Sequence, residues 1–341
     1  MTAARPRAAI LAVDGGNSKT DVALVTADGR LLAALRGPTT SHQQVGLEAG
    51  ADRMAGLVAE ARGRAGLADD DPPPLVGVYA LAGADTAADM RRLTAALAGR
   101  HLAGTSLVVN DAFAPIRAGS TRRWGIALIC GSGMNAAGVA PDGRTARLAA
   151  LGDISGDWGG GGDVGLAALG AAVRARDGRG PRTALEAVVP RHFGYTRPID
   201  VTRAIEAGAI PHARVRELSP VVFVVAGRGD PVARSIVDRL ADELVAMAGA
   251  IIHQLHLSRA DPDVVMAGGV FNARDDAFEA RIAAGVRAVA PRATLRRSDG
   301  PPVLGAALLG LDHLGGSGSA AHEAAEARLR AALRGWEPAN G

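Results

Sequence analysis

The stretch ILAVDGGNSKTDVALV, residues 10–25, decides how the fold of this chain is interpreted. Two short apolar runs flank a glycine-containing turn, and this pattern predicts a β-hairpin. Because a turn of glycines lacks Cβ atoms, its backbone N–H groups can approach an anion closely. Side-chain donors next to the two glycines strengthen the prediction of a phosphate-binding turn, and they belong to Asn17, Ser18, Lys19 and Thr20.

Asp14 ends the first apolar run of this hairpin. A carboxylate in that position is poorly placed to touch a phosphate directly. It is well placed to hold Mg²⁺ through water, because Mg²⁺ prefers carboxylate, water and substrate phosphate oxygens. The alternative is a surface hairpin with ordinary polar turn residues, and the segment alone leaves both interpretations open.

The same pattern occurs a second time, in the stretch GIALICGSGMNAAGVA, residues 125–140. An apolar strand, a Gly-Ser-Gly turn and a second strand follow one another, and both copies then end in Asp-Gly-Arg, 114 residues apart. A repeat of this length is typical of a duplicated domain. Two such domains could bind one polyphosphate between them, each through its own glycine-containing turn. Chance similarity between two glycine-rich hairpins is the alternative.

Composition excludes several classes of protein. The chain has 341 residues, of which 48% are hydrophobic, enough for two packed cores. Its formal net charge is only +3 and its arginines are scattered among acids, so nucleic acid is not an expected partner. Cys130 is the one cysteine, which excludes a disulfide framework. Because we find neither a signal-peptide pattern nor an apolar run of about 18 residues, we expect a cytoplasmic protein without a membrane partner.

Strand-like runs alternate with helical ones along the chain, which predicts an α/β fold with mixed sheets. After the first hairpin come a third strand, a helix, a strand that ends before Gly83, a helix and a strand that ends at Asn110. The second half repeats this order with a helical insertion at about 164–250. We therefore expect an N-terminal domain, a C-terminal domain with the insertion, and a linker followed by a terminal helix, with the bounds 1–118, 119–315 and 316–341.

Four short motifs follow one another along the chain: Asp14-Gly15-Gly16, Asn110-Asp111, Gly131-Ser132-Gly133 and Ala267-Gly268-Gly269-Val270. Together they resemble the sugar-kinase, Hsp70 and actin ATPase superfamily. With the glycine- and aspartate-rich stretch 151–161, the chain more closely resembles the N-acetylglucosamine kinase and BadF/BadG-type ATPase family. This resemblance implies an α/β fold of two ribonuclease H-like domains, each with a mixed five-stranded sheet flanked by helices, and an ATP cleft between them.

The resemblance also implies which residues bind ATP and Mg²⁺. Asp14 would organise the Mg²⁺, and two glycine-rich turns would surround the β- and γ-phosphates with backbone N–H groups. The residues concerned are Gly15, Gly16, Asn17, Ser18, Lys19 and Thr20 in the first phosphate turn, Gly131, Ser132 and Gly133 in the second phosphate turn, and Gly268 and Gly269 beneath the adenosine.

Asp111 is the general base that the resemblance implies. Phosphoryl transfer needs an acceptor oxygen in line with the γ-phosphate and a carboxylate that takes its proton. Asp111 follows a strand, where ligands usually bind in α/β folds. The alternative is that this residue caps the helix expected over 112–118.

The sugar contacts are less conventional than the phosphate turns. Ser41 stands where the N-acetylglucosamine kinases of the family have an asparagine that touches the sugar, which puts the acetamido preference in question. His42 and Gly83 are further candidates, although a loop histidine is often only a polar surface residue. Asp153 is the preferred acceptor for sugar hydroxyl groups, with Asp157 second. We interpret the glycines that follow as a loop that closes over the sugar.

The sequence thus predicts an ATP- and Mg²⁺-dependent kinase that phosphorylates an amino sugar, first of all N-acetylglucosamine at its 6-hydroxyl. Glucosamine and N-acetylmuramic acid remain alternative acceptors, and the family resemblance favours a homodimer. One rival is an ATPase that activates a partner enzyme. Such relatives hold an iron–sulfur cluster through cysteines, whereas Cys130 is the one cysteine of this chain. A second rival is a transcriptional sugar sensor, which would need a DNA-binding segment, and no helix-turn-helix pattern precedes Ile10.

Overall fold

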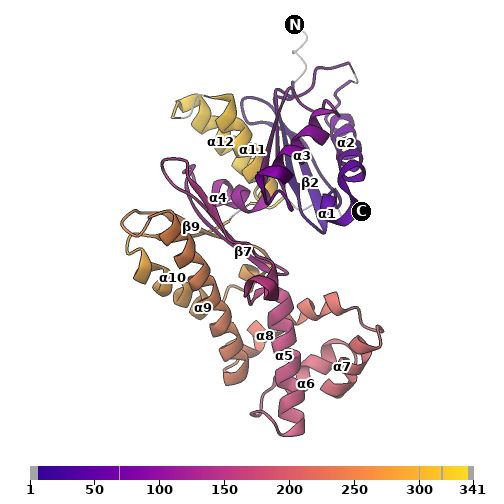
Figure 1. The fold of residues 1–341 in the computed structure, drawn as a ribbon, viewed down its shortest axis with the longest axis vertical. Helices are drawn as coiled ribbons and strands as arrows, with labels where there is room; N and C mark the ends of the chain where they lie inside the picture. Colours follow the sequence, from indigo (N-terminus) through magenta and orange to yellow (C-terminus); the bar gives the residue numbers. More distant parts are fainter. Residues whose placement is uncertain (1–6, 69, 299, 316–317, 337–341) are drawn as a thin grey trace. The chain divides into compact units, whose positions relative to one another are not determined.

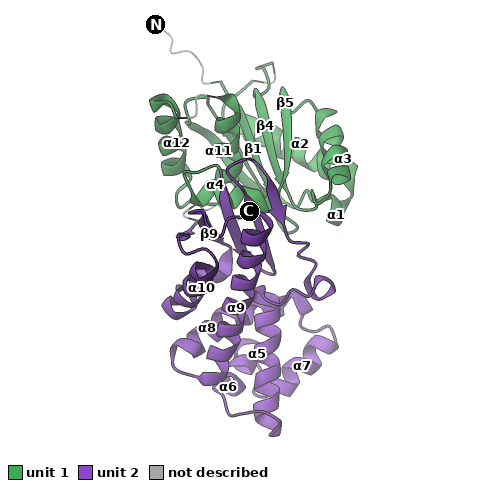
Figure 2. Cartoon of the chain, turned by 60° about the vertical axis from the view of Figure 1, so that its left-hand side comes forward, with its two compact units in different colours: residues 1–123, 298–341 green, residues 124–297 purple. Residues whose placement is uncertain are grey.

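The computed structural model divides the chain into two compact units (Figure 2). The first unit combines residues 1–123 with 298–341, and the second consists of residues 124–297. Residues described by the structure are 7–68, 70–298, 300–315 and 318–336. None of the helices in these ranges combines the length and the apolar character that crossing a bilayer requires.

The first unit is built on a mixed five-stranded sheet in the order β3-β2-β1-β4-β5. β1 pairs antiparallel with β2 and parallel with β4, so the predicted hairpin is confirmed. The parallel strands β1, β4 and β5 end at one edge of the sheet, which is where side chains after each strand can meet. The strands are β1 (Ile10–Gly15), β2 (Lys19–Val25), β3 (Leu31–Pro38), β4 (Val76–Leu81) and β5 (Thr105–Asn110).

Helices cover both faces of this sheet, because side chains alternate between the faces of a strand. Ile10 and Ala12 pack with residues of α11 and α12, whereas Leu11 and Val13 pack with residues of α2 and α3. Figure 1 shows these two pairs of helices on opposite sides of the sheet. The helical elements of the unit are α1 (His42–Val45), α2 (Leu47–Arg64), α3 (Ala87–Ala98), η1 (Asp111–Phe113), α4 (Ala114–Gly119), α11 (Pro302–Leu314) and α12 (Ala320–Leu333).

The second unit repeats the topology of the first. Its sheet has the order β10-β9-β6-β7-β8, in which β6 and β7 form the hairpin and β9 pairs parallel with β6. Read from β8, this is the order of the first sheet, as the 114-residue repeat predicts. The strands are β6 (Gly125–Cys130), β7 (Met134–Val139), β8 (Thr145–Arg147), β9 (Asp263–Ala267) and β10 (Thr294–Arg297).

A helical insertion separates β8 from β9, in the region where the sequence predicts one. It supplies most of the apolar core of the second unit and packs against one face of the sheet. Its elements, with the two that follow β9, are η2 (Gly152–Ser155), α5 (Gly160–Asp177), α6 (Leu185–His192), α7 (Pro198–Glu206), η3 (His212–Glu217), α8 (Leu218–Gly227), α9 (Pro231–Gln254), η4 (Gly269–Ala273) and α10 (Asp276–Val289).

The C-terminal part of the chain differs from the expected bounds. The sequence analysis assigned residues up to 315 to the second domain, but α11 belongs to the first unit and packs on β1 and α4. The packing is close: a Cβ atom on Gly305 would lie 1.9 Å from the carbonyl oxygen of Ala114. Only glycine allows this approach. Of the expected linker, Gly316 and Ser317 lie outside the described residues.

Candidate active site

The first phosphate turn is a tight connection between β1 and β2. The N–H of Gly16 donates to the carbonyl of Lys19 (2.9 Å), and the intervening side chains of Asn17 and Ser18 are exposed. Thr20 differs from them. It is buried, and its Oγ1 accepts a hydrogen bond from the backbone N–H of Thr40 (3.0 Å). Its hydroxyl therefore holds the protein together rather than facing a ligand.

Side-chain hydrogen bonds connect the loop after β3 to this turn. The hydroxyl of Thr39 donates to the carbonyl of Gly16 (2.8 Å), and the hydroxyl of Ser41 donates to Oδ1 of Asn17 (2.6 Å). The structure thus brings Ser41, expected at the sugar, into direct contact with Asn17, expected at the phosphate. The hydroxyl proton of Ser41 is used in this bond, whereas the lone pairs of its oxygen can still accept a hydrogen bond.

His42 and Gly83 also come together. Gly83 has a positive φ of 80°, and a Cβ atom there would lie 2.5 Å from Cε1 of His42. Within the described chain, the buried Nδ1 atom of His42 has no hydrogen-bond partner. An unpartnered ring nitrogen is costly when buried, and a ligand hydroxyl is one group that would satisfy it.

Asn110 rather than Asp111 caps the short helix after β5. Its Oδ1 accepts from the N–H of Ala112 (3.0 Å), and its Nδ2 donates to Oδ1 of Asp85 (2.9 Å). The capping alternative for Asp111 is therefore wrong, since the residue before it fills that role. Asp111 is the first residue of η1, directly after the end of β5.

Burial first, and then the nearby charges of Asp111 and Asp21, raise the pKa of Asp14 to about 7. Sequence reasoning missed Asp21, which is fully buried and pairs with Asp14 across β1 and β2. The guanidinium of Arg36 holds Asp21 through two hydrogen bonds of 2.6 and 2.8 Å. Alternation along β2 could have placed Asp21 on the face of Asp14. Nothing in the sequence pairs it with Arg36.

This arrangement fits a divalent cation that is bound together with a nucleotide. Burial and two like charges disfavour ionised Asp14 unless a cation stands next to it. The described residues contain no group of three or more His, Cys, Asp or Glu side chains that could hold a metal alone. Mg²⁺ does not need one, because it keeps several waters and binds through one or two carboxylates and substrate phosphates.

The second phosphate turn joins β6 to β7 and is held by the start of α5. The N–H groups of Gly161 and Gly162 donate to the carbonyls of Gly131 (2.7 Å) and Ser132 (3.0 Å). A Cβ atom on Gly160, where φ is +77°, would lie 2.5 Å from Cα of Gly133. The interpretation of these glycines as a loop closing over the sugar is wrong. Gly160, Gly161 and Gly162 form the first turn of α5, and at Gly160 only a glycine allows the two backbones to touch.

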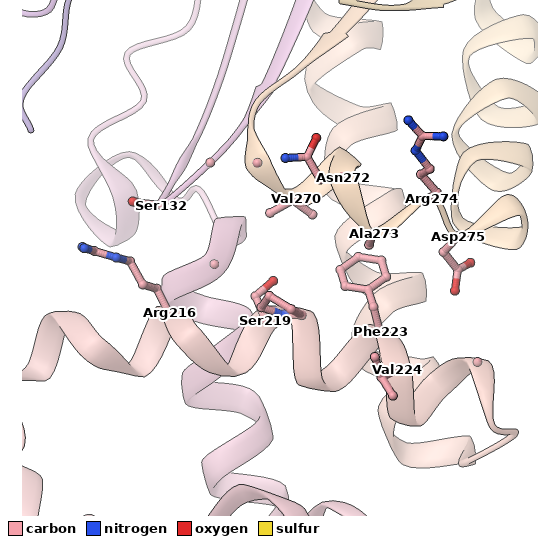
Figure 3. Close-up of a pocket in the computed structure, with 15 residues that line it drawn as sticks. Ser132, Arg216, Ser219, Phe223, Val224, Val270, Asn272, Ala273, Arg274 and Asp275 are labelled. Atoms are coloured by element: carbon pink, nitrogen blue, oxygen red, sulfur yellow. The ribbon is translucent and has the colours of Figure 1, made fainter. Parts of the chain in front are cut away.

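A cavity of about 730 Å³ opens next to this turn in the second unit (Figure 3). Apolar side chains from α8 and η4 form much of its wall, and Gly131, Ser132 and Gly269 belong to its lining. Such a wall suits the flat, apolar faces of a nucleobase. The carboxyl ends of the parallel strands β6 and β9 bring the two glycine motifs together here. The largest apolar residues of the lining are Phe223, Val224 and Val270.

Gly268 has a structural reason to be glycine that differs from the expected one. Its φ is +105°, and a Cβ atom would lie 2.3 Å from the carbonyl oxygen of Cys130. The collision is therefore with β6 of the protein, whereas the neighbouring Gly269 lines the cavity.

Asp153 and Asp157 lie in the second unit, on and just after η2. Asp153 is exposed, and Asp157 accepts a short hydrogen bond from the hydroxyl of Ser155. The other sugar candidates, around His42, belong to the first unit. That all of them serve one sugar site stays a prediction.

Residues 11–310 match the BadF/BadG/BcrA/BcrD ATPase family. The chain belongs to this family. Among its curated relatives is the N-acetylmuramic acid/N-acetylglucosamine kinase of Clostridium acetobutylicum, which is 29% identical over 77% of this chain and 85% of the relative. The N-acetyl-D-glucosamine kinase of Dictyostelium discoideum is 26% identical over 89% of this chain and 97% of the relative.

Solved structures share the fold as well. A Chromobacterium violaceum protein, named as a candidate N-acetylglucosamine kinase, superposes with a TM-score of 0.70 at 22% identity, covering 89% of this chain and 99% of its own. The two-sheet α/β architecture that the resemblance implied is confirmed. In this BadF/BadG/BcrA/BcrD family member, each unit presents a glycine-rich turn at the carboxyl edge of its sheet.

Proposed function

We propose that the protein is an ATP- and Mg²⁺-dependent kinase that phosphorylates the 6-hydroxyl of an amino sugar, with N-acetylglucosamine as the first candidate. The names of the two curated relatives support this substrate class. The observation that carries the chemistry is the pair Asp14 and Asp111. Asp14 lies near the end of β1 beside the first phosphate turn, Asp111 follows the parallel strand β5 of the same sheet, and the charge of Asp111 raises the pKa of Asp14.

Asp111 would take the proton of the sugar hydroxyl as its oxygen bonds to the γ-phosphorus and ADP leaves. Asn110 supports this role, because it caps η1 and bonds Asp85, which fixes the backbone on which Asp111 stands. Asp14 would hold Mg²⁺, which supplies charge neutralisation for the phosphates when bound. The N–H groups of the two phosphate turns would orient them.

The test is the pair of variants Asp111→Asn and Asp111→Ala in a coupled ADP-release assay with a panel of amino sugars. Loss of the base should lower kcat by about 10²- to 10⁴-fold. Asp52→Asn is the control, since Asp52 is exposed and pairs with Arg100 on the surface. Sugar-dependent ADP release near the wild-type rate in both Asp111 variants would reject this base. Wild-type protein that turns over no sugar in the panel would reject the kinase itself.

The sugar panel also tests the acetamido preference. It should contain N-acetylglucosamine, glucosamine and N-acetylmuramic acid, because Ser41 replaces the expected asparagine and one relative is named for two of these sugars. We further propose a cytoplasmic homodimer, on the family resemblance, which light scattering of the purified protein would test.

An ATPase that activates a partner through an iron–sulfur cluster finds no support in Cys130. The thiol is buried inside β6, and burial raises its pKa to about 12. A thiol of this kind is a poor metal ligand, because the thiolate is the ligating form.

A further inference from the structure

Arg216 stands next to the second phosphate turn and lines the cavity of the second unit. It belongs to η3, in the helical insertion. A Cβ atom on Gly161 would lie 3.4 Å both from Cβ of Arg216 and from the carbonyl oxygen of Gly131, so the arginine and the turn flank the same glycine. Figure 3 shows its guanidinium extending on the side of the cavity where Ser132 lies.

The guanidinium of Arg216 makes no hydrogen bond or ion pair with any residue in the described part of the chain. Its neighbour on η3 behaves differently. Arg214 donates to Glu217 (2.8 and 3.0 Å) and lies over the ring of Phe193. Two arginines of one short element thus differ in partners, and the one without partners is the one that faces the cavity.

Apart from Arg216, the described lining residues place no positive charge at the end of the cavity next to the second phosphate turn, where a phosphate chain would leave the cavity. The second phosphate turn offers backbone groups and the hydroxyl of Ser132, but no cationic side chain. Arg274, the other cation of the lining, lies beside Asp275 at the far end of the cavity (Figure 3). Asp275, the one acidic residue of the lining, is neutralised by Arg234 through bonds of 3.0 and 2.7 Å.

We propose that Arg216 binds the diphosphate portion common to ATP and ADP where it passes from the cavity to the second phosphate turn. A guanidinium presents a planar fork of N–H donors that matches two phosphate oxygens, and its charge is not consumed by a protein carboxylate. This inference rests on the proposed nucleotide site and adds to it a charged residue that none of the glycine motifs predicts.

The experiment is calorimetric titration of ATP, ADP and adenosine into the full chain and its Arg216→Gln, Arg216→Lys and Arg214→Gln variants. Arg216→Gln should raise the Kd of ADP about 10- to 100-fold, as expected for one charge-assisted contact, and leave the Kd of adenosine within about twofold. Arg216→Lys should recover part of the loss, because it keeps the charge but not the fork. Arg214→Gln, which removes the same charge two residues away, should bind ADP as the wild type does.

The possible outcomes separate this inference from the proposed function. Wild-type protein that binds neither ATP nor ADP rejects both. Wild-type binding with equal ADP affinity in Arg216→Gln rejects only the role of Arg216. An equal loss for adenosine and ADP also rejects it, because the side chain would then support the cavity wall. Matching circular dichroism spectra of the variants exclude misfolding as the cause.

Discussion

Replacing Asp14 by asparagine should stabilise the protein in the absence of metal and nucleotide. The pKa of this carboxyl rises from 3.8 to about 7 on folding, first because it is buried and then because Asp111 and Asp21 lie nearby. Between those two pH values the folded state binds more protons than the unfolded state, so the unfolding free energy falls as pH rises. The free-energy cost of ionising Asp14 in the folded state is absent below about pH 4 and complete above about pH 7. Asparagine has no charge and avoids it.

The magnitude follows from the same values. A rise in the pKa of Asp14 from 3.8 in the unfolded state to about 7 in the folded state corresponds to a loss of about 4 kcal/mol of unfolding free energy. The side chain is partly accessible to water and lies near Lys19 and Arg36, so we expect about half of this, about 2 kcal/mol, at pH 8. At pH 5, just over one unit above the unfolded-state value, the difference between the variant and the wild type should be about 1 kcal/mol.

Urea unfolding followed by circular dichroism, at several values between pH 5 and pH 8 and with a chelator present, measures this difference. The stability gained by Asp14→Asn should grow with pH across the series. Asp52→Asn, which removes an exposed carboxylate paired with Arg100, should show a small and nearly constant effect. A gap for Asp14→Asn that stays constant with pH, or that narrows as pH rises, would refute the reasoning. Adding Mg²⁺ and ATP should stabilise the wild type more than the variant.

Two further predictions concern other parts of the fold. Arg117→Met should lower the unfolding free energy by about 3–5 kcal/mol in urea titrations, because Asp312 and Glu326 both lose the buried guanidinium that is paired with them. Arg123→Met, at a half-exposed pair, should cost about 1 kcal/mol or less, and equal effects would contradict this account. Gly160→Ala should destabilise the protein by about 2 kcal/mol and weaken ATP binding in calorimetry, because its Cβ meets the second phosphate turn. Gly170→Ala, in the same helix with open space, should raise stability by up to about 1 kcal/mol.

The parts of the fold that the sequence predicts well are those in which local signals suffice. Both hairpins appear as expected, because short apolar runs and glycine turns specify them without help from distant residues. The strands expected to end before Gly83 and at Asn110 do so, at Leu81 and Asn110, for the same reason. A repeated pattern then predicted a repeated topology, since equal local patterns fold into equal units.

The parts that sequence reasoning missed depend on contacts between distant segments. An apolar helix such as α11 can cover either sheet, and only its packing against β1 and α4 assigns it to the first unit. The charges of α12 look like a solvated helix face. In the structure, however, Glu326 pairs with the buried Arg117, more than two hundred residues earlier in the chain. A run of glycines can equally be a flexible loop or the start of a helix, and the contact of Gly160 with Gly133 decides between them.

The carboxylates of the first unit have different surroundings. Arg36 on the next strand donates two hydrogen bonds to Asp21, so the charge partner of this carboxylate is fixed. Asp14 faces that same Asp21 and Asp111, and in the absence of a ligand it has only partial help from the neighbouring cations. Arg36 is hydrogen-bonded to Asp21 and offsets the raised pKa of Asp14 only in part. We therefore expect a Mg²⁺ ion bound together with the nucleotide to supply the positive charge that Asp14 lacks.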